Sequence, residues 1–486
     1  MTRAGFPFLF GIYGKKASRD TVSLLKDTGA CGVLLLARNI ETAEQTRALT
    51  EELVQRVGRP LIFSIDHEGG WVLRFKSGVT PLPGNCALGR AGDEKLAYET
   101  GRLMAQELRP LGIQLNLAPV VDVLAGPYNP GIGIRSFGTD AALAGKLGAA
   151  MIRGMQDHGV AACAKHFPGK GAATVDAHVS MPTIKLAPKV FEANHLRPFK
   201  DAVDAGVASV MTSHVKYPAL DKKIGTFSSK ITGDILRKKL GFEGVIMADD
   251  LCMGAVTGKM TVQEAAVQSF AAGHDLLIIA HDVQAMTDAP ELLEQAVAAD
   301  VIERSCTRIE KLIDPPGKAK GKIDGAKLAM EVARLGVQKV REGRVAVPMA
   351  PSRKPLLVVV PDFREVAERF TFEGGPLGPE KLIQKRLKAW GPARVVRAPV
   401  ETEETRGLEK EAAAADRVLL FCFEARRFPG QKAALKALSK AAADKTTLCM
   451  IRGGWDLELA ARAMTAVDAG GYRLAQLDAA LDSLLS

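Results

Sequence analysis

The first two-thirds of the chain repeats one hydrophobic pattern about eight times. A short apolar run, rich in β-branched residues, is followed by a longer segment with apolar residues at three- and four-residue intervals. Runs that are apolar throughout are typical of strands buried on both faces, and the longer segments are typical of amphipathic helices. The short runs are FPFLFGIY, CGVLLLAR, PLIFSID, IQLNLAP, VAACAKHF, VASVMTSHV, GVIMADD and HDLLIIA.

Strands that alternate with helices predict a parallel sheet covered by helices. About eight such units in roughly 300 residues is the number expected for a (β/α)8, TIM-like barrel. We therefore predict the α/β fold class, with a barrel domain over residues 1–345.

A smaller domain is predicted after the barrel. The composition changes after DPPGKAKGKIDG, where a predicted helix, AKLAMEVARLGVQKV, leads to a proline- and arginine-rich connector, EGRVAVPMAPSRKP. Five more apolar runs alternate with helices, which predicts an α/β domain with a mostly parallel sheet over residues 346–486. Its glycine pairs lack the spacing of nucleotide-binding loops, so no cofactor is expected.

Composition narrows the class of protein. Apolar residues make up 47% and charged residues 25% of the 486-residue chain, as in globular proteins. No stretch reaches the ~20 apolar residues of a membrane span, no signal peptide is recognisable, and the seven cysteines form no C-x-x-C pair. We expect a cytoplasmic protein without structural zinc or disulfides. The net charge of +10 is dispersed and aromatic residues are only 5%, which disfavours nucleic-acid binding.

Polar side chains follow most of the predicted barrel strands at the point where each strand ends. The carboxyl ends of barrel strands meet on one face, where active sites are built. All eight histidines also lie in the predicted barrel domain. We therefore predict a catalytic site on this face. The strand-end residues are Asp66, Asn116, Lys165, His166, His214, Asp249, Asp250 and His281.

Asp249 and Asp250 come directly after the apolar run VIMA. Adjacent strand-end residues point to opposite sides, so one can face the barrel axis while the other holds the next loop. A carboxylate surrounded by cations stays ionised, as a nucleophile must. Capping of the next helix is the alternative role, and it stays open for Asp250.

Asp176 and His178 lie two positions apart in a glycine-rich segment. In an extended loop they face the same side, so the carboxylate can raise the basicity of the imidazole, which predicts an acid/base pair. A metal site is the alternative, but no metal-binding spacing occurs, and Lys165 and Arg135 would repel a divalent cation. We expect no metal. The potential metal ligands are Asp66, His67, His166, His178, His214 and Asp249.

Four motifs resemble those of the β-N-acetylglucosaminidases (NagZ type) of glycoside hydrolase family 3. KHFPGKGAATVDAHVSMP is similar to K-H-F-P-G-x-G-x-x-x-x-D-x-H-x-x-x-P, and SIDHEGGWVLRF to D-x-E-G-G-x-V-x-R-F. LNLAPVVDV is similar to L-N-x-A-P-V-x-D, and NPGIGIRSFG to N-P-x-I-G-x-R-S-F-G. GFEGVIMADDLCMGAV resembles the segment with the family nucleophile. The motifs occur in the family's order over residues 1 to about 345, and the second domain resembles that of two-domain members.

The resemblance implies a retaining, double-displacement mechanism. Asp249 would be the nucleophile, and His178, paired with Asp176, would be the mobile general acid/base. An imidazole with a near-neutral pKa suits both halves of that task. We add His214 as a candidate because it also ends a strand. The residues expected to bind a terminal N-acetylglucosamine are then Asp66, Arg74, Arg135, Lys165, His166 and His214.

The implied function is an exo-acting β-N-acetylglucosaminidase that trims cell-wall muropeptides and binds a small carbohydrate substrate. A β-N-acetylglucosaminide phosphorylase, a β-glucosidase and a non-catalytic sugar-binding protein are the alternatives. The chain departs from the family pattern at Lys170, Ala172 and Trp71, where His, Asp and Arg are usual. These positions neighbour the predicted catalytic residues, so the resemblance does not determine which leaving group the enzyme accepts.

Overall fold

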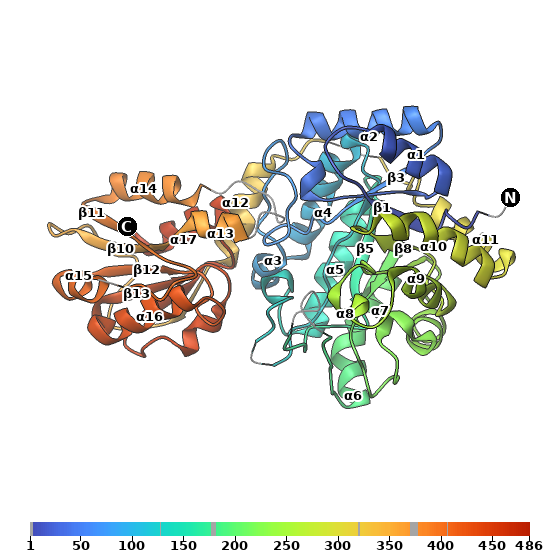
Figure 1. Ribbon diagram of the computed structural model, residues 1–486. Coiled ribbons are helices and arrows are strands. Elements are labelled where there is room, and N and C mark those ends of the chain that lie inside the picture. The colour runs from blue at the N-terminus through green and yellow to red at the C-terminus, as the bar shows by residue number, and fades with distance from the viewer. Residues whose placement is uncertain (1–2, 127, 176–180, 319–320, 370–377, 406) are drawn as a thin grey trace. The chain divides into compact units, whose positions relative to one another are not determined.

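The computed structural model describes residues 3–126, 128–175, 181–318, 321–369, 378–405 and 407–486 (Figure 1). The chain divides into two compact units. The first comprises residues 1–68, 72–80 and 92–323, and the second comprises residues 69–71, 81–91 and 324–486. The single boundary near residue 345 stays a prediction.

The first unit contains an eight-stranded parallel sheet with the order β7-β6-β5-β4-β3-β2-β1-β8. Strand β1 pairs with β8, and a bridge between Met247 and Leu276 links β7 to the residue before β8, so the sheet nearly closes. The predicted barrel is confirmed. Its strands are β1 (Phe8–Gly11), β2 (Gly32–Leu35), β3 (Ile62–Ile65), β4 (Leu115–Asn116), β5 (Ala161–Phe167), β6 (Ser209–Thr212), β7 (Val245–Ala248) and β8 (Leu277–Ile279).

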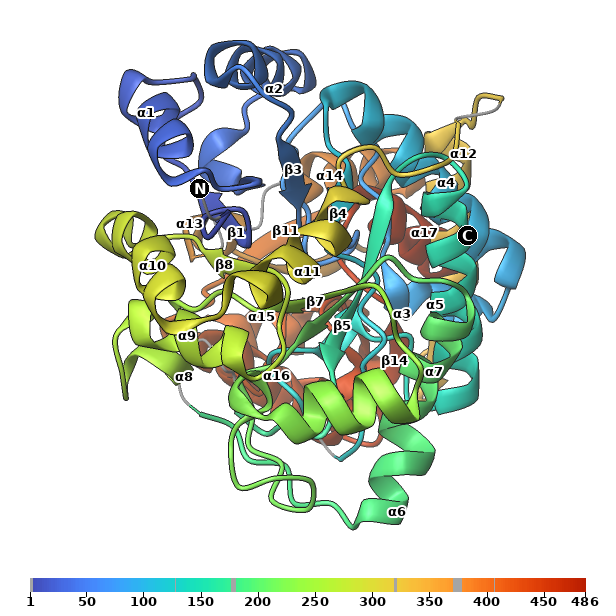
Figure 2. The same ribbon diagram turned by 90° about the vertical axis from the view of Figure 1, so that its right-hand side faces the viewer.

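Helices lie outside the barrel strands, as Figure 2 shows for α1, α2, α9 and α10. Several begin at a residue whose side chain caps the helix: Thr42, Asp93 and Asp140 each accept a hydrogen bond from the first turn. The longer helices of this unit are α1 (Arg19–Thr28), α2 (Ala43–Val57), α4 (Glu94–Leu108), α5 (Ala141–Gln156), α7 (Arg197–Asp204), α9 (Val262–Ala271), α10 (Val283–Ala296) and α11 (Ala299–Glu310).

Shorter helical segments occupy the loops of this unit. Two of them, η4 and η6, are π-helical. The segments are η1 (Ala37–Asn39), η2 (Arg109–Leu111), η3 (Gly133–Arg135), α6 (Pro188–Val190), η4 (Phe191–Leu196), η5 (Gly225–Phe227), η6 (Lys230–Lys239) and α8 (Gly254–Thr257). None of the described helices is long and apolar enough to cross a bilayer.

The second unit contains a six-stranded sheet with the order β11-β10-β12-β13-β14-β9. Every pair is parallel except β14–β9, which confirms the mostly parallel sheet. Its strands are β9 (Gln338–Arg341), β10 (Leu356–Pro361), β11 (Ala393–Ala398), β12 (Val418–Cys422), β13 (Thr446–Met450) and β14 (Thr465–Asp468). Its helices are α3 (Asn85–Ala91), α12 (Gly325–Gly336), α13 (Phe363–Arg369), α14 (Pro379–Trp390), α15 (Leu408–Ala414), α16 (Pro429–Ala441), η8 (Ala443–Lys445), η9 (Gly454–Glu458) and α17 (Leu474–Leu484).

The helix predicted over AKLAMEVARLGVQKV is wrong at its end. Helix α12 stops at Gly336, Val337 is extended, and β9 starts at Gln338. The backbone leaves the helix because residues 338–341 pair with β14 at the edge of the sheet. Tertiary pairing therefore overrides the helical periodicity of this stretch.

Candidate active site

The barrel places the predicted residues at the carboxyl ends of its strands. Asp66 directly follows β3, Asp249 directly follows β7, and His214 lies two residues after β6. Lys165 and His166 are near the end of β5, where both are buried. Arg135 ends η3, in the connection between β4 and α5, and Arg74 lies in the loop after β3.

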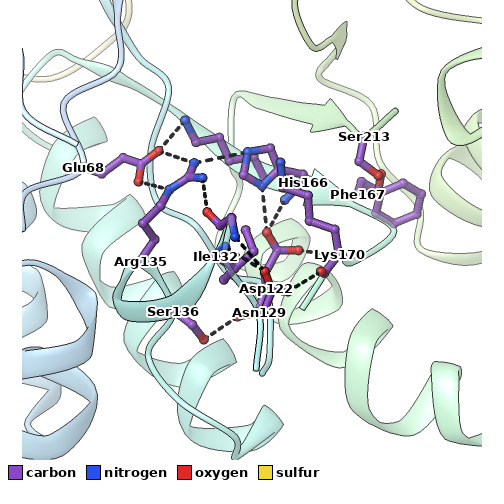
Figure 3. Close-up of polar contacts among 12 residues, drawn as sticks. Glu68, Asp122, Asn129, Ile132, Arg135, Ser136, His166, Phe167, Lys170 and Ser213 are labelled. Atoms are coloured by element: carbon purple, nitrogen blue, oxygen red, sulfur yellow. Dashed lines mark hydrogen bonds and ion pairs between the residues drawn. The ribbon is translucent and has the colours of Figure 1, made fainter. Parts of the chain in front are cut away.

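Five charged side chains form a buried network at this face. Lys165 Nζ lies 2.7 Å from Asp66 Oδ1 and 2.7 Å from Glu68 Oε1. Arg135 donates from Nε and Nη2 to the two Glu68 oxygens, each at 2.8 Å, in the fork geometry visible in Figure 3. Arg74 Nη2 donates to Asp66 Oδ2 at 3.1 Å. Three cations thus share two carboxylates, which leaves the network one positive charge in excess.

The pairing keeps Asp66, Glu68 and Lys165 ionised. Burial alone would raise the pKa of Asp66 and Glu68, but the neighbouring cations, Lys165 and Arg74 for Asp66 and Arg135 and Lys165 for Glu68, hold both below their ordinary values. Burial would lower the pKa of Lys165, but Asp66 and Glu68 raise it above its ordinary value. The site therefore offers fixed charged donors and acceptors, which suit the hydroxyl groups of a ligand.

Asp122 orients His166. Its Oδ2 lies 2.7 Å from His166 Nδ1 and accepts the His166 backbone N–H at 3.2 Å. Its Oδ1 accepts the backbone N–H of Lys170 at 2.7 Å. Burial raises the pKa of Asp122 to about 6 in spite of these hydrogen bonds. The ring is thereby held with Nε2 3.4 Å from Arg135 Nη2 (Figure 3).

The first part of the glycine-rich segment after β5 is tied to the β4 connection. Asn129 Nδ2 donates to the Lys170 carbonyl at 2.9 Å, and Ala125 donates its N–H to the Gly171 carbonyl at 3.2 Å. A Cβ on Gly171 would lie 1.8 Å from the Val123 carbonyl oxygen, so only glycine fits. The predicted acid/base pair, Asp176 and His178, lies outside the described residues.

The two aspartates after β7 make different contacts. Asp249 accepts the backbone N–H of Asp250 at 3.0 Å. Asp250 Oδ1 accepts the N–H groups of Cys252 and Ala280, each at 3.1 Å, so Asp250 holds both the next loop and the end of β8. The nucleophilic role of Asp249 stays a prediction.

His214 lies beside these aspartates. Its Nε2 is 3.0 Å from the Asp250 carbonyl oxygen and its Nδ1 is 2.6 Å from Thr226 Oγ1. Burial lowers its pKa, although the nearby Asp249 charge opposes that shift, so the ring is neutral at neutral pH. Both nitrogens thus bond to the protein, and contact of His214 with substrate stays a prediction.

The site contains two acids, Glu68 and Asp122, that the analysis of strand ends missed. Glu68 lies two residues beyond Asp66, and Asp122 follows β4 by six residues, so neither is a strand-end residue. The available signal was the motifs themselves, because SIDHEGG contains Glu68 and LNLAPVVDV contains Asp122. Within the described ranges, no group of three or more His, Cys, Asp or Glu side chains is placed to hold a metal ion.

Comparisons with known proteins match this site and fold. The family model described as "Glycosyl hydrolase family 3 N terminal domain" matches residues 6–312. A β-hexosaminidase of Thiobacillus denitrificans is 36% identical over 298 residues, which cover 60% of this chain and 81% of that protein. A β-hexosaminidase of Hydrogenovibrio crunogenus is 37% identical over 277 residues, which cover 56% of this chain and 76% of that protein.

Two solved structures extend the comparison. The glycoside hydrolase family 3 β-N-acetylglucosaminidase from Paenibacillus sp. is 31% identical with a TM-score of 0.91, covering 99% of this chain and 95% of that one. NagZ from Neisseria gonorrhoeae, in complex with N-trifluoroacetyl-D-glucosamine, is 30% identical with a TM-score of 0.61, covering 69% of this chain and 99% of that one.

Proposed function

Because the chain belongs to glycosyl hydrolase family 3, and is therefore a glycoside hydrolase, we propose that it is a retaining exo-β-N-acetylglucosaminidase. The observation that carries this proposal is the buried network of Asp66, Glu68, Arg135 and Lys165 on the face from which Asp249 emerges. Its relatives include β-hexosaminidases and an enzyme that binds an N-acylated glucosamine.

The network supplies the binding of the non-reducing sugar in this proposal. Asp66 accepts hydrogen bonds from sugar hydroxyls, Lys165 and Arg74 donate to hydroxyl oxygens, and the His166 ring, held by Asp122 and Arg135, lies beside them. These side chains are already oriented by one another, so little ordering is required when the sugar binds. An exo-acting enzyme needs such a closed set of contacts around one terminal sugar.

The chemical step uses two displacements at the anomeric carbon. An Asp249 carboxylate oxygen attacks that carbon, while the glycosidic oxygen takes a proton from the His178 imidazolium and leaves with the bonding electrons. The neutral imidazole then takes a proton from water, whose oxygen attacks the same carbon and displaces Asp249. Two inversions retain the configuration. Asp176 supports the imidazolium in the first step.

We extend the proposal to cell-wall muropeptides as substrates, in the cytoplasm. The net charge of +10 is compatible with an acidic leaving group. Both the muropeptide substrate and the location stay predictions.

Trapping of the intermediate tests the proposal. We expect a 5-fluoro-N-acetylglucosaminyl fluoride to label the protein once, on the peptide that contains Asp249, because the fluorines slow release of the glycosyl-enzyme more than its formation. Mass spectrometry of the digested protein locates the label. The Asp249→Asn variant should stay unlabelled, and a variant of an exposed acid, Asp234→Asn, should label like the wild type.

A label on any other residue would overturn the nucleophile assignment. The same protein is assayed on aryl β-N-acetylglucosaminide and β-glucoside with and without phosphate. We expect free N-acetylglucosamine in both buffers and no turnover of the glucoside. Formation of a sugar 1-phosphate would identify a phosphorylase, and faster glucoside turnover would identify a β-glucosidase.

A further inference from the structure

One aromatic side chain is unusually exposed at the carboxyl ends of the barrel strands. Tyr13, two residues after β1, is 52% exposed. Within the ranges that the structure describes, it is the only Phe, Tyr or Trp whose exposure exceeds about a third. The mechanism above uses neither Tyr13 nor the residues that it contacts.

Tyr13 is held in a fixed orientation by residues that follow strands β2 and β8. Its Oη donates to the His281 carbonyl oxygen at 3.0 Å, and the Arg38 guanidinium carbon lies 4.4 Å from its ring centroid. Arg38 is itself anchored, because Nε donates to the Ile12 carbonyl at 2.8 Å and Nη2 to the Ala280 carbonyl at 2.6 Å. An exposed ring that is already ordered loses little entropy when a ligand stacks on it.

Tyr13, Arg38 and His281 form a cluster that adjoins Asp249, the predicted nucleophile. His281 Nδ1 is 2.9 Å from Arg38 Nη1, and His281 Nε2 is 3.7 Å from Asp250 Oδ2. The backbone N–H of Asp250 donates to the Asp249 carboxylate at 3.0 Å. Tyr13, Arg38 and His281 are therefore joined to Asp249 through one intervening residue.

In the order of the barrel strands, the cluster lies on the part of the carboxyl-end face where no sugar-binding residue is predicted. The predicted sugar-binding residues lie at or after β3, β4, β5 and β6, and Asp249 follows β7. In the barrel order, β8, β1 and β2 complete the ring between β7 and β3. Tyr13, Arg38 and His281 follow these three strands, of which β8 pairs with β1 and β1 with β2.

We propose that Tyr13, Arg38 and His281 form the subsite for the leaving group of the substrate, with specificity for an acidic sugar. This inference rests on the proposed function, since it assigns residues to the part of the site that the terminal sugar does not occupy. The Tyr13 ring stacks on the apolar face of the leaving sugar. Arg38 has five N–H donors, and the three protein acceptors found among the described residues leave donors for a carboxylate on that sugar.

Charge on the surrounding loop agrees with an acidic ligand. Lys15 and Lys16 follow Tyr13 in the same exposed loop. Lys15 pairs with Glu41 at 3.1 Å, and both side chains are largely exposed. The half-exposed His281 ring, whose Nδ1 lies 2.9 Å from Arg38 Nη1, adds a polar group to the cluster.

Two substrates with the same terminal sugar test the proposal. N-acetyl-β-glucosaminyl fluoride has a one-atom leaving group, whereas N-acetylglucosaminyl-β-1,4-N-acetylmuramic acid has an acidic sugar. For Tyr13→Ala we expect the ratio of kcat/KM for the disaccharide to that for the fluoride to fall about tenfold, through KM, because one stacking contact is lost. Tyr13→Phe keeps the ring and should restore most of this ratio.

The controls separate this role from a structural one. Leu292→Ala removes an exposed apolar side chain from the outer helix α10 and should leave the ratio unchanged. N,N′-diacetylchitobiose, a neutral disaccharide, should lose affinity in Tyr13→Ala but change little in Arg38→Lys, whereas the acidic disaccharide should lose affinity in both.

Each other outcome would overturn the subsite. Equal losses for the fluoride and the disaccharides in Tyr13→Ala would mean that the ring only supports the fold of the barrel. An unchanged ratio would mean that the leaving group binds elsewhere. A wild-type protein that turns over neither substrate would overturn the proposed function, and the subsite with it. The trapping experiment tests the proposed function independently of the subsite.

Discussion

Glu68 compensates two buried cations at once. Its carboxylate lies 2.7 Å from Lys165 Nζ and 2.8 Å from two nitrogens of Arg135, and its side chain is 2% exposed. Removing one partner of a buried ion pair leaves the other charge buried and uncompensated. This destabilises the protein by far more than the intact pair stabilises it. Glu68 therefore matters both for the stability of the barrel and for the positions of Lys165 and Arg135.

We expect Glu68→Gln to lower the free energy of unfolding by about 3 kcal/mol. It should also lower kcat/KM by about 100-fold, because Lys165 and Arg135 lose the group that positions them. Urea unfolding followed by far-UV circular dichroism measures the first effect, and an aryl β-N-acetylglucosaminide measures the second.

Glu41→Gln is the matched control, because Glu41 also pairs with a lysine but its side chain is 62% exposed. Exposed pairs contribute little, so this variant should stay within about 0.5 kcal/mol of the wild type. Similar losses of unfolding free energy in both variants would show that burial of the Glu68 ion pairs does not make them more important for stability than an exposed pair.

At this scale the sequence identifies residues but not their partners. Asp66 and Lys165 are predictable because each ends an apolar run. Their contact joins positions 99 apart in the chain, and no spacing rule encodes it. Glu68 and Asp122 escape the strand-end analysis because the groups that make them important, Lys165 and His166, approach only in the folded barrel.

The connection after β4 and the segment after β5 act together as elements. Asp122, Ala125 and Asn129 bond to residues 166–171, and the two backbones approach so closely that Gly171 has no room for a side chain. This contact fixes the start of the segment that leads toward the predicted acid/base pair.

Gly171→Ala should lower kcat by about 100-fold while the barrel still folds. A Cβ at this position would lie 1.8 Å from the Val123 carbonyl oxygen, so the segment must move away from the β4 connection. Steady-state kinetics on the aryl substrate measures the effect, and circular dichroism confirms folding.

Gly233→Ala provides the comparison, because a Cβ at Gly233, in η6, meets no atom within 4 Å. Alanine in a helix is favoured over glycine, so this variant should be as active as the wild type and slightly more stable. An active Gly171→Ala would refute the positioning role of the contact.

Hydrophobic patterns predict elements better than they predict element ends. The eight apolar runs of the barrel each contain a strand, because full burial demands apolar residues on both faces. Strand β4 keeps only two residues of its run, and β9 replaces the end of a predicted helix. In both places hydrogen bonding to a distant strand, which local sequence does not specify, decides where the element ends.

At the scale of the whole molecule, the second unit is assembled from separate parts of the chain. Residues 69–71 and 81–91 belong with residues 324–486. Within this unit Arg473, which is 1% exposed, donates to the carbonyl oxygens of Gly70 at 2.5 Å and Trp71 at 3.2 Å. No feature of the sequence pattern around residue 70 indicates this membership, because the partners lie about 400 residues away.

Arg473→Ala should destabilise the second unit by about 2–4 kcal/mol, because two buried carbonyl oxygens lose their donor and a cavity is left behind. The expected effect can be observed selectively. All three tryptophans, Trp71, Trp390 and Trp455, belong to this unit, so intrinsic fluorescence during urea unfolding reports on it.

Trp71 makes this readout sensitive to the predicted change. The Arg452 guanidinium carbon lies 3.8 Å from its ring centroid, and the rings of Tyr472 and Phe423 lie at 5.7 and 6.2 Å. Release of the backbone at Gly70 and Trp71 should shift its emission to the red before the main transition. Arg394→Ala removes an arginine whose side chain is 68% exposed and should leave both the emission and the midpoint unchanged. If the two arginine variants unfold alike, Arg473 does not hold residues 69–71 in the second unit.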